Sequence, residues 1–174
     1  MANKQINALS ELTSVEETDL LVVYDVDEGG SEKTKKILKS NFLAYEEGTF
    51  TPTSADAASG GSTGTTGIGH YTKIGRAVHI NLRIQNIDTG GMTGGNIFYI
   101  QGLPFTSIGG MMTNGVVRAD TITFPGYLTV SLTGGTSSIY LADNTSAGAN
   151  AVVTVSELSS GVSDVRITMT YFTA

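Results

Sequence analysis

Residues 78–85 (VHINLRIQ) alternate apolar and polar side chains along their whole length. Val78, Ile80, Leu82 and Ile84 are apolar, and a polar residue follows each of them. Because successive side chains of a strand point to opposite faces, this period of two predicts a strand with one buried face and one solvent-exposed face. The chain must therefore contain a sheet that covers a core on one side.

This strand is expected to belong to a wide β-hairpin that spans residues 71–104. Gly75 marks a fold-back or a bulge before it, because glycine has no Cβ to clash. Residues 89–95 are rich in glycine and form the predicted loop, and the apolar residues 97–100 form the returning strand. We therefore expect the two apolar strands to pair with each other across this loop.

Further short strands are expected along the chain, separated by turn residues about every 8–12 positions. They are residues 20–24, 34–38, 49–52, 111–124, 127–132, 138–141, 151–155 and 165–172. Residues 54–69, a low-complexity stretch of Ser, Gly, Thr and Ala, and residues 142–150 are predicted to be loops. The pattern contains no long helix and is typical of an all-β fold, an antiparallel β-sandwich of the jelly-roll kind.

Charge divides the chain into two parts. Up to Gly48 the sequence holds ten Asp and Glu against five Lys and Arg, whereas the remainder holds six against five. A boundary at Glu46–Gly48 therefore separates an N-terminal module, residues 1–45, from a head, residues 46–174. The strands expected at 20–24 and 34–38 form a two-stranded hairpin, which is marginally stable alone. We expect this module to need a partner, and an oligomer of the chain is the simplest source.

Several classes of partner are excluded by composition. The net charge of −6 provides no basic field for a nucleic acid. The chain has no cysteine, so disulfides and thiolate metal sites are excluded. No apolar run approaches the ~18 residues of a membrane span, and the N-terminus lacks the pattern of a secretory signal. We expect no nucleic-acid partner and no membrane insertion.

Several strings resemble the β-sandwich head domains at the ends of bacteriophage tail fibres. In the head they are residues 47–52 (EGTFTP), 71–78 (YTKIGRAV), 102–105 (GLPF) and 156–161 (SELSSG). The N-terminal part looks like the attachment module of phage tail-fibre and tail-appendage proteins, through residues 9–12 (LSEL), 19–25 (DLLVVYD) and 34–37 (TKKI).

This resemblance implies a homotrimer in the virion, at the tail or on the outer surface, with other phage tail or capsid proteins as partners. The N-terminal module would attach it to the particle, and the head would contact a glycan or protein of the host surface. A long fibre would carry a repetitive shaft between anchor and head, which this sequence lacks. The resemblance therefore implies a short tail fibre or tail appendage, or alternatively a capsid decoration (cement) protein.

Candidate binding residues lie in loops, where binding usually resides. The loops are residues 89–95, 107–113 and 142–150, and the receptor-binding candidates in or beside them are Thr89, Met92, Thr93, Met111, Met112, Asn114 and Asn144. The paired methionines form either a soft contact surface or ordinary packing. Three tyrosines would either stack on sugar rings or sit in a core or subunit interface, namely Tyr99, Tyr127 and Tyr140. The candidates for attachment and oligomerisation are Leu20, Val22, Tyr24, Ile37 and Phe42.

Two features have the residue types of a metal site. Residues 25–30 (DVDEGG) alternate oxygen ligands as calcium loops do, but they lack the twelve-residue spacing, so a solvated hairpin turn is favoured. His70 and His79 are the only histidines and are expected on the surface or in an interface. A trimer that placed three copies of His79 on its axis would create an ion site. Within one chain, we expect no metal and no cofactor.

The sequence offers no catalytic constellation. Glycoside hydrolysis needs two carboxylates facing one groove ~5–10 Å apart, and the acidic residues of the head are scattered. They are Asp56, Asp88, Asp120, Asp143, Glu157 and Asp164. No G-x-S-x-G motif is present, and the glycine-rich stretches lack the Lys-Ser/Thr ending of a phosphate loop. A non-enzymatic protein is therefore expected, and a polysaccharide depolymerase is disfavoured.

Overall fold

The computed structural model describes residues 20–24, 34–38, 44–145, 148 and 150–173. The chain separates into two compact units, Met1–Tyr45 and Glu46–Ala174. In the first unit, strand β1 (Leu20–Tyr24) pairs antiparallel with β2 (Thr34–Leu38), so both strands predicted there are confirmed.

The attachment candidates fall partly on this strand pair. Leu20, Val22 and Tyr24 belong to β1, and Ile37 is a half-buried residue of β2. Phe42 and the expected turn at residues 25–30 lie outside the described residues.

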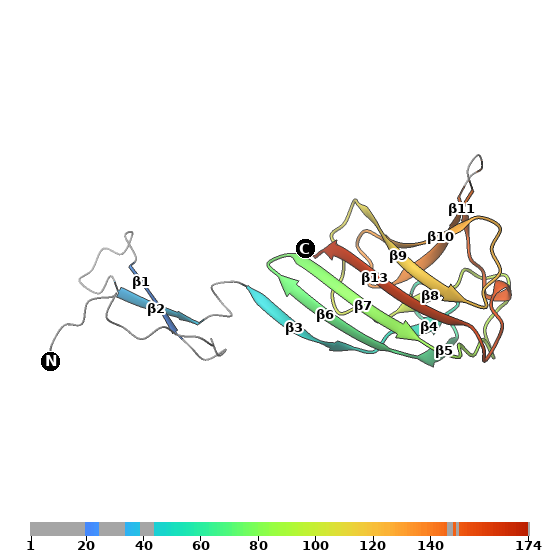
Figure 1. The fold of residues 1–174 in the computed structure, drawn as a ribbon, viewed down its shortest axis with the longest axis horizontal. Helices are drawn as coiled ribbons and strands as arrows, with labels where there is room; N and C mark the ends of the chain where they lie inside the picture. Colours follow the sequence, from blue (N-terminus) through green and yellow to red (C-terminus); the bar gives the residue numbers. More distant parts are fainter. Residues whose placement is uncertain (1–19, 25–33, 39–43, 146–147, 149, 174) are drawn as a thin grey trace. The chain divides into compact units, whose positions relative to one another are not determined.

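The second unit is an antiparallel sheet that curls into a half-barrel (Figure 1). Its strands are β3 (Tyr45–Phe50), β4 (Thr53–Ala55), β5 (Thr63–Thr66), β6 (Ile68–Ile74), β7 (Ala77–Ile84), β8 (Tyr99–Gln101), β9 (Met112–Asp120), β10 (Tyr127–Thr133), β11 (Ile139–Asn144), β12 (Ala151–Val152) and β13 (Asp164–Phe172). They follow the order β3-β6-β7-β13-β9-β10-β11-β8-β4-β5, and β12 pairs with β11. The described residues contain one short 3₁₀ helix, η2 (Val155–Glu157), and no α-helix, so the all-β prediction is confirmed.

The curl of the sheet follows from two short connections. Only Thr51 and Pro52 separate β3 from β4, and only Gly67 separates β5 from β6. Yet β3 and β6 stand at one end of the strand order, and β4 and β5 stand at the other. The Gly67 amide donates a hydrogen bond to the Pro52 carbonyl oxygen at 2.7 Å, which joins the two connections. The two ends of the sheet must therefore approach each other.

Strand β9 changes its partner half-way along its length. Met112 to Gly115 pair with β10, whereas Val116 to Asp120 pair with β13. A Cβ on Gly115 would lie 2.5 Å from the Met169 Cβ, closer than real Cβ contacts come. Glycine is therefore required where the strand passes from one neighbour to the other.

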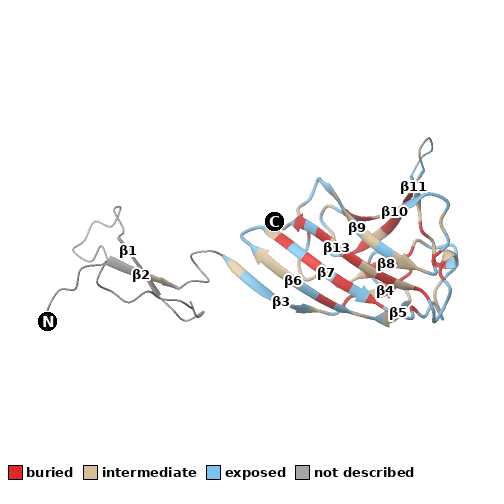
Figure 2. Ribbon diagram, viewed as in Figure 1, coloured by how far each residue is buried: buried red, intermediate tan, exposed pale blue. Residues whose placement is uncertain are grey.

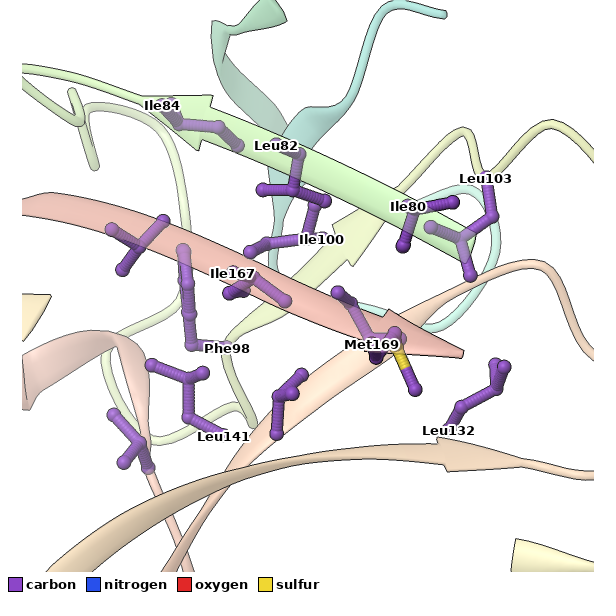
Figure 3. Packing of buried hydrophobic residues seen from close by; sticks show 14 of the residues in the cluster. Ile80, Leu82, Ile84, Phe98, Ile100, Leu103, Leu132, Leu141, Ile167 and Met169 are labelled. Carbon is purple, nitrogen blue, oxygen red and sulfur yellow. The ribbon is translucent and has the colours of Figure 1, made fainter. Parts of the chain in front are cut away.

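The core lies on the concave side of the sheet. Val78, Ile80, Leu82 and Ile84 are all buried, while the residues between them are exposed, as the alternation of β7 predicted (Figure 2). Strand β13 repeats this pattern and buries four alternate residues, Val165, Ile167, Met169 and Tyr171. These side chains pack with apolar residues from other strands and loops, among them Phe98, Ile100, Leu103, Leu132 and Leu141 (Figure 3). Each such burial contributes about 1.5–3 kcal/mol relative to exposure.

The predicted pairing across residues 89–95 is wrong. Strand β7 pairs with β6 and β13, while the returning strand β8 pairs with β4 and β11. The reason is the tight turn at Gly75–Arg76, where Gly75 adopts φ +58° and brings β6 directly beside β7. The alternating strand β13 then occupies the other edge of β7, so no edge is left for β8.

The two loop predictions are also partly wrong. Residues 54–69 contain β5 and parts of β4 and β6, because β-branched threonines such as Thr63 and Thr66 extend the chain beside β4. Strand β11 continues to Asn144, so the loop expected from residue 142 begins later. Residues 151–155 supply the two-residue strand β12 and the start of η2 instead of one strand.

Candidate functional site

The outer face of β9, β10, β11 and β12 carries a hollow of about 490 Å³, here called the tyrosine cleft. Its lining is polar and aromatic, with one methionine and a few small apolar side chains. The lining residues are Met112, Asn114, Tyr127, Thr129, Ser131, Tyr140, Ala142, Asn144, Asn150, Ala151 and Val152.

The period of two along β10 creates the floor of the cleft. Tyr127, Thr129 and Ser131 line the cleft, whereas Val130 and Leu132 between and beyond them are buried in the core. Strand register then assembles the walls, since residues of neighbouring strands that face each other share one face of the sheet. Three cross-strand pairs result: Ser131 with Tyr140, Thr129 with Ala142, and Tyr127 with Asn144.

Two asparagine side chains in the cleft are held by hydroxyl groups. The Asn144 Nδ2 donates to the Thr129 Oγ1 at 2.8 Å, and the Ser131 Oγ donates to the Asn114 Oδ1 at 2.8 Å. Within the described part of the chain, the Asn144 Oδ1 and the Asn114 Nδ2 have no hydrogen-bond partner. One oriented acceptor and one oriented donor are therefore free for a ligand.

The two tyrosines of the cleft differ in exposure. Tyr140 is half-buried, its ring packs edge-on against Tyr99 at 5.9 Å between centroids, and its hydroxyl lies 3.9 Å from the Met112 sulfur. Tyr127 leaves 62% of its surface exposed. The cleft thus presents one fixed aromatic ring and one open ring.

No charged side chain occurs among the described residues that line the cleft. Aromatic rings offer apolar surface to ring C–H groups, and oriented amides and hydroxyls bind polar substituents. This combination suits a neutral ligand that carries both, as a sugar does. A carboxylate pair for acid–base chemistry is missing from the lining.

Two acidic residues of the head instead hold loops in place. The buried Asp56 accepts hydrogen bonds from the Thr93 amide at 2.9 Å and the Ser62 amide at 2.7 Å. The bond from Thr93 is the main cause that lowers the pKa of Asp56 below its usual value. Asp88 accepts from the Gly90 amide at 2.8 Å, and this bond likewise lowers the pKa of Asp88.

The other four acidic residues considered for catalysis in the sequence also have partners within the unit. Asp143 accepts from the Gly126 amide, Glu157 from the Thr154 amide, and Asp164 from the Asn86 amide, while Asp120 contacts Arg118 and Arg166. The described residues contain no group of three or more His, Cys, Asp or Glu placed to hold a metal ion. All six of these carboxylates therefore have hydrogen-bond or ion-pair partners within the unit.

The candidate binding residues separate into three sets. Met112, Asn114 and Asn144 come together in the cleft. Thr89, Met92 and Thr93 belong to the loop held by Asp56 and Ser160, and none of them lines the cleft. Met111 is 62% exposed and is not part of the lining.

The three predicted loops do not share one end of the sheet. The loop predicted at residues 107–113 lies at the start of β9, and its last two residues already belong to that strand. The loop with Thr89 lies toward the other end of β9, because Asp164 pairs with Asp120 there and accepts a hydrogen bond from the Asn86 amide at 2.8 Å. The cleft forms along the strands and not at either end. Its residues share the outer face of the sheet, and this follows only from the pairing register of β9, β10 and β11.

The histidines lie on exposed positions, as predicted. His79 contacts the Thr170 hydroxyl through Nδ1 at 3.0 Å and the Asn81 amide nitrogen through Nε2 at 3.1 Å. Both ring nitrogens thus have a partner within the chain. An ion site on a three-fold axis stays a prediction.

No family model, curated protein or solved structure matches the chain. The resemblance to phage tail-fibre heads therefore rests on the sequence strings alone. None of the helical segments within the described residues is long and apolar enough to cross a membrane.

Sequence reasoning missed several residues of the cleft. Thr129 and Ser131 share the period of Tyr127, and this alternation was the available signal. Ala142 and residues 150–152 carry no signal of their own, because they reach the cleft only through the pairing of β11 with β10 and β12.

Proposed function

We propose that this chain is a non-enzymatic phage virion protein, a short tail fibre or tail appendage, whose tyrosine cleft binds a neutral glycan of the host surface. The observation that carries the binding claim is the cleft itself. Tyr127 and Tyr140 supply aromatic surface, and Asn114 and Asn144 supply an oriented donor and acceptor. The virion setting is supported by the resemblance of the sequence strings.

The absence of a carboxylate from the described cleft lining supports binding without turnover. Glycoside hydrolysis needs an acid and a second carboxylate on the two sides of the scissile bond. The carboxylates of Asp56 and Asp88 are already bound to backbone amides, and their lowered pKa values make them poor proton donors near neutral pH.

The proposal includes a homotrimer with β-sandwich heads, attached to the particle through residues 1–45. Large apolar side chains on the surface are consistent with contacts between copies, among them Ile74 at 58% and Val162 at 56% exposure. Light scattering should give about three times the 18.1 kDa of one chain. A monomer would argue against the trimer and leave the cleft as a feature of a free-standing module.

Binding can be tested by presenting the full chain to an array of bacterial surface glycans. We expect wild-type protein to bind a neutral glycan and Tyr127→Ala to lose at least about tenfold in affinity, as removal of a central aromatic contact does. Phe172→Ala is the matched control, because it removes another exposed aromatic ring outside the cleft. Absence of binding to every glycan, or equal losses in both variants, would refute the cleft as a glycan site.

The virion claim needs a separate measurement. Quantitative mass spectrometry of purified particles should find a handful to a few dozen copies for a tail part, whereas hundreds would indicate a decoration protein. A chain that lacks residues 1–45 should fail to join particles. Normal incorporation of that truncated chain would refute the attachment role.

A further inference from the structure

Three arginines stand side by side on the outer face of the sheet, in a single row across adjacent strands. Arg83 of β7 faces Arg166 of β13, and Arg166 faces Arg118 of β9. Neighbouring strands are about 4.8 Å apart, so the row spans about 10 Å between its outer members. We call this feature the arginine row.

Like charges directly opposite each other destabilise a sheet. One carboxylate partly relieves the repulsion, since Asp120 lies 3.4 Å from Arg118 and 4.0 Å from Arg166. Arg83 has no ion pair with any described residue. The row therefore retains excess positive charge that this part of the chain does not neutralise.

The row lies in a shallow groove of about 510 Å³. Ile68 faces Arg83 from β6 and is 67% exposed, and Val116 on β9 is 71% exposed. The next row of the groove holds the neutral polar residues Asn81 and Thr168 together with His70. A ligand here meets guanidinium groups with apolar side chains at both ends of the groove.

We propose that the arginine row binds the carboxylate groups of an acidic polysaccharide. The guanidinium fork matches a carboxylate in geometry and charge. The hydrogen-bonded sheet fixes successive arginines one strand apart, so the outer two are separated by roughly the length of two sugar residues in an extended chain. The apolar side chains of Ile68 and Val116 can cover the C–H surfaces of the sugar rings.

Other occupants fit less well. A second copy placed by a two-fold axis would bring this patch against itself and oppose arginine with arginine. A nucleic acid is drawn by an extended basic surface, whereas this chain carries a net charge of −6. The inference does not depend on the tyrosine cleft, because no arginine lines that cleft.

The test is isothermal titration of the full chain with two uronic acid polymers, oligogalacturonate and oligomannuronate, and with neutral dextran. We expect binding of at least one uronate and no binding of dextran. Arg83→Gln should weaken uronate binding about tenfold and Arg83→Gln/Arg166→Gln further, as loss of charge-assisted hydrogen bonds does. Affinity should also fall as salt is raised.

A matched control makes the result specific. Arg76→Gln removes the same charge from the β6–β7 turn, outside the groove, and should leave binding unchanged. Failure of both uronates to bind, or equal losses in Arg76→Gln and Arg83→Gln, would overturn the proposal. A lower molecular mass of Arg83→Gln in light scattering would also overturn it, since the row would then be an interface between copies.

Discussion

Tyr171 donates its phenolic hydrogen bond to the carbonyl oxygen of Phe105 at 3.0 Å, from a side chain with no exposed surface. The bond ties the last strand of the sheet to the segment that follows β8. The hydrogen bond is partly buried, and a carbonyl that loses its donor in such a place keeps part of the cost of desolvation. We therefore expect Tyr171→Phe to lower the free energy of unfolding by about 1–2 kcal/mol, measured by urea denaturation. An unchanged midpoint would show that water or another donor replaces the bond.

Stability at alkaline pH should depend on the same residue. Burial raises the pKa of Tyr171 to about 12, whereas a tyrosine of the unfolded chain titrates near pH 10. The folded state holds the proton more tightly, so this contribution is fully present below pH 10 and is lost as pH rises toward 12. Urea unfolding between about pH 9 and pH 11 should show a steeper loss of stability for wild type than for Tyr171→Phe. Parallel curves would contradict this assignment.

Gly115 should tolerate no larger residue. A Cβ there would lie 2.5 Å from the Met169 Cβ and 2.7 Å from the Thr168 carbonyl oxygen. Gly115→Val is expected to lower the free energy of unfolding by about 1–3 kcal/mol, the usual cost of overpacking. Gly109→Ala is the control, because nothing lies within 4 Å of its added Cβ. Similar losses in both variants would show that crowding at Gly115 is not the cause, because the entropy of the unfolded chain favours both replacements of glycine.

Asp56→Asn should loosen the two loops that this carboxylate joins. The Ser62 and Thr93 amides both donate to it, and an amide side chain offers one acceptor oxygen for these two donors. We expect faster hydrogen exchange at both amides and a lower unfolding midpoint. Since the pKa of Asp56 is lowered in the folded state, the wild-type contribution should be present above the unfolded pKa of 3.8 and lost as pH falls below it. The variant should show a smaller acid dependence.

In the cleft, Asn144→Ala should weaken binding of a neutral glycan at least about tenfold, because it removes an oriented acceptor. Thr129→Val keeps the shape of the neighbouring side chain and removes only the hydroxyl that orients Asn144, so a smaller loss is expected. Asn96→Ala is the control outside the cleft. A larger loss for Thr129→Val than for Asn144→Ala would show that the hydroxyl itself contacts the ligand.

Local sequence patterns predicted where the strands lie better than they predicted which strands pair with each other. The burial of alternate residues along β7 follows from the alternation of apolar and polar side chains in its eight residues, because an apolar side chain indicates the buried face and a polar one the exposed face. The partner of β7 does not follow, since β13 lies about 80 residues away in sequence and pairing is decided by contacts of the whole sheet. The glycine-rich loop was therefore assigned to the wrong pair of strands, although Gly75 correctly marked a reversal.

The same limit applies to the surface features. Asn114 and Asn144 were both candidates, but in separate segments, and their convergence depends on β10 lying between β9 and β11. The arginine row was invisible in the sequence, because Arg83, Arg118 and Arg166 are isolated residues in three different strands. Only the register places them opposite one another.

Strand β9 passes from β10 to β13, and so it runs through both the tyrosine cleft and the groove of the arginine row and fixes the distance between them. Its outward residues run from Met112 and Asn114 in the cleft to Val116 and Arg118 in the groove. Asn114 and Arg118 are four residues apart on one strand, a distance of about 13 Å that the hydrogen-bonded sheet holds constant. A polymer that fills both hollows must repeat its neutral and acidic sugars in phase with that spacing. Selectivity would then depend on the order of neutral and acidic sugars along the polysaccharide as well as on which sugars it contains.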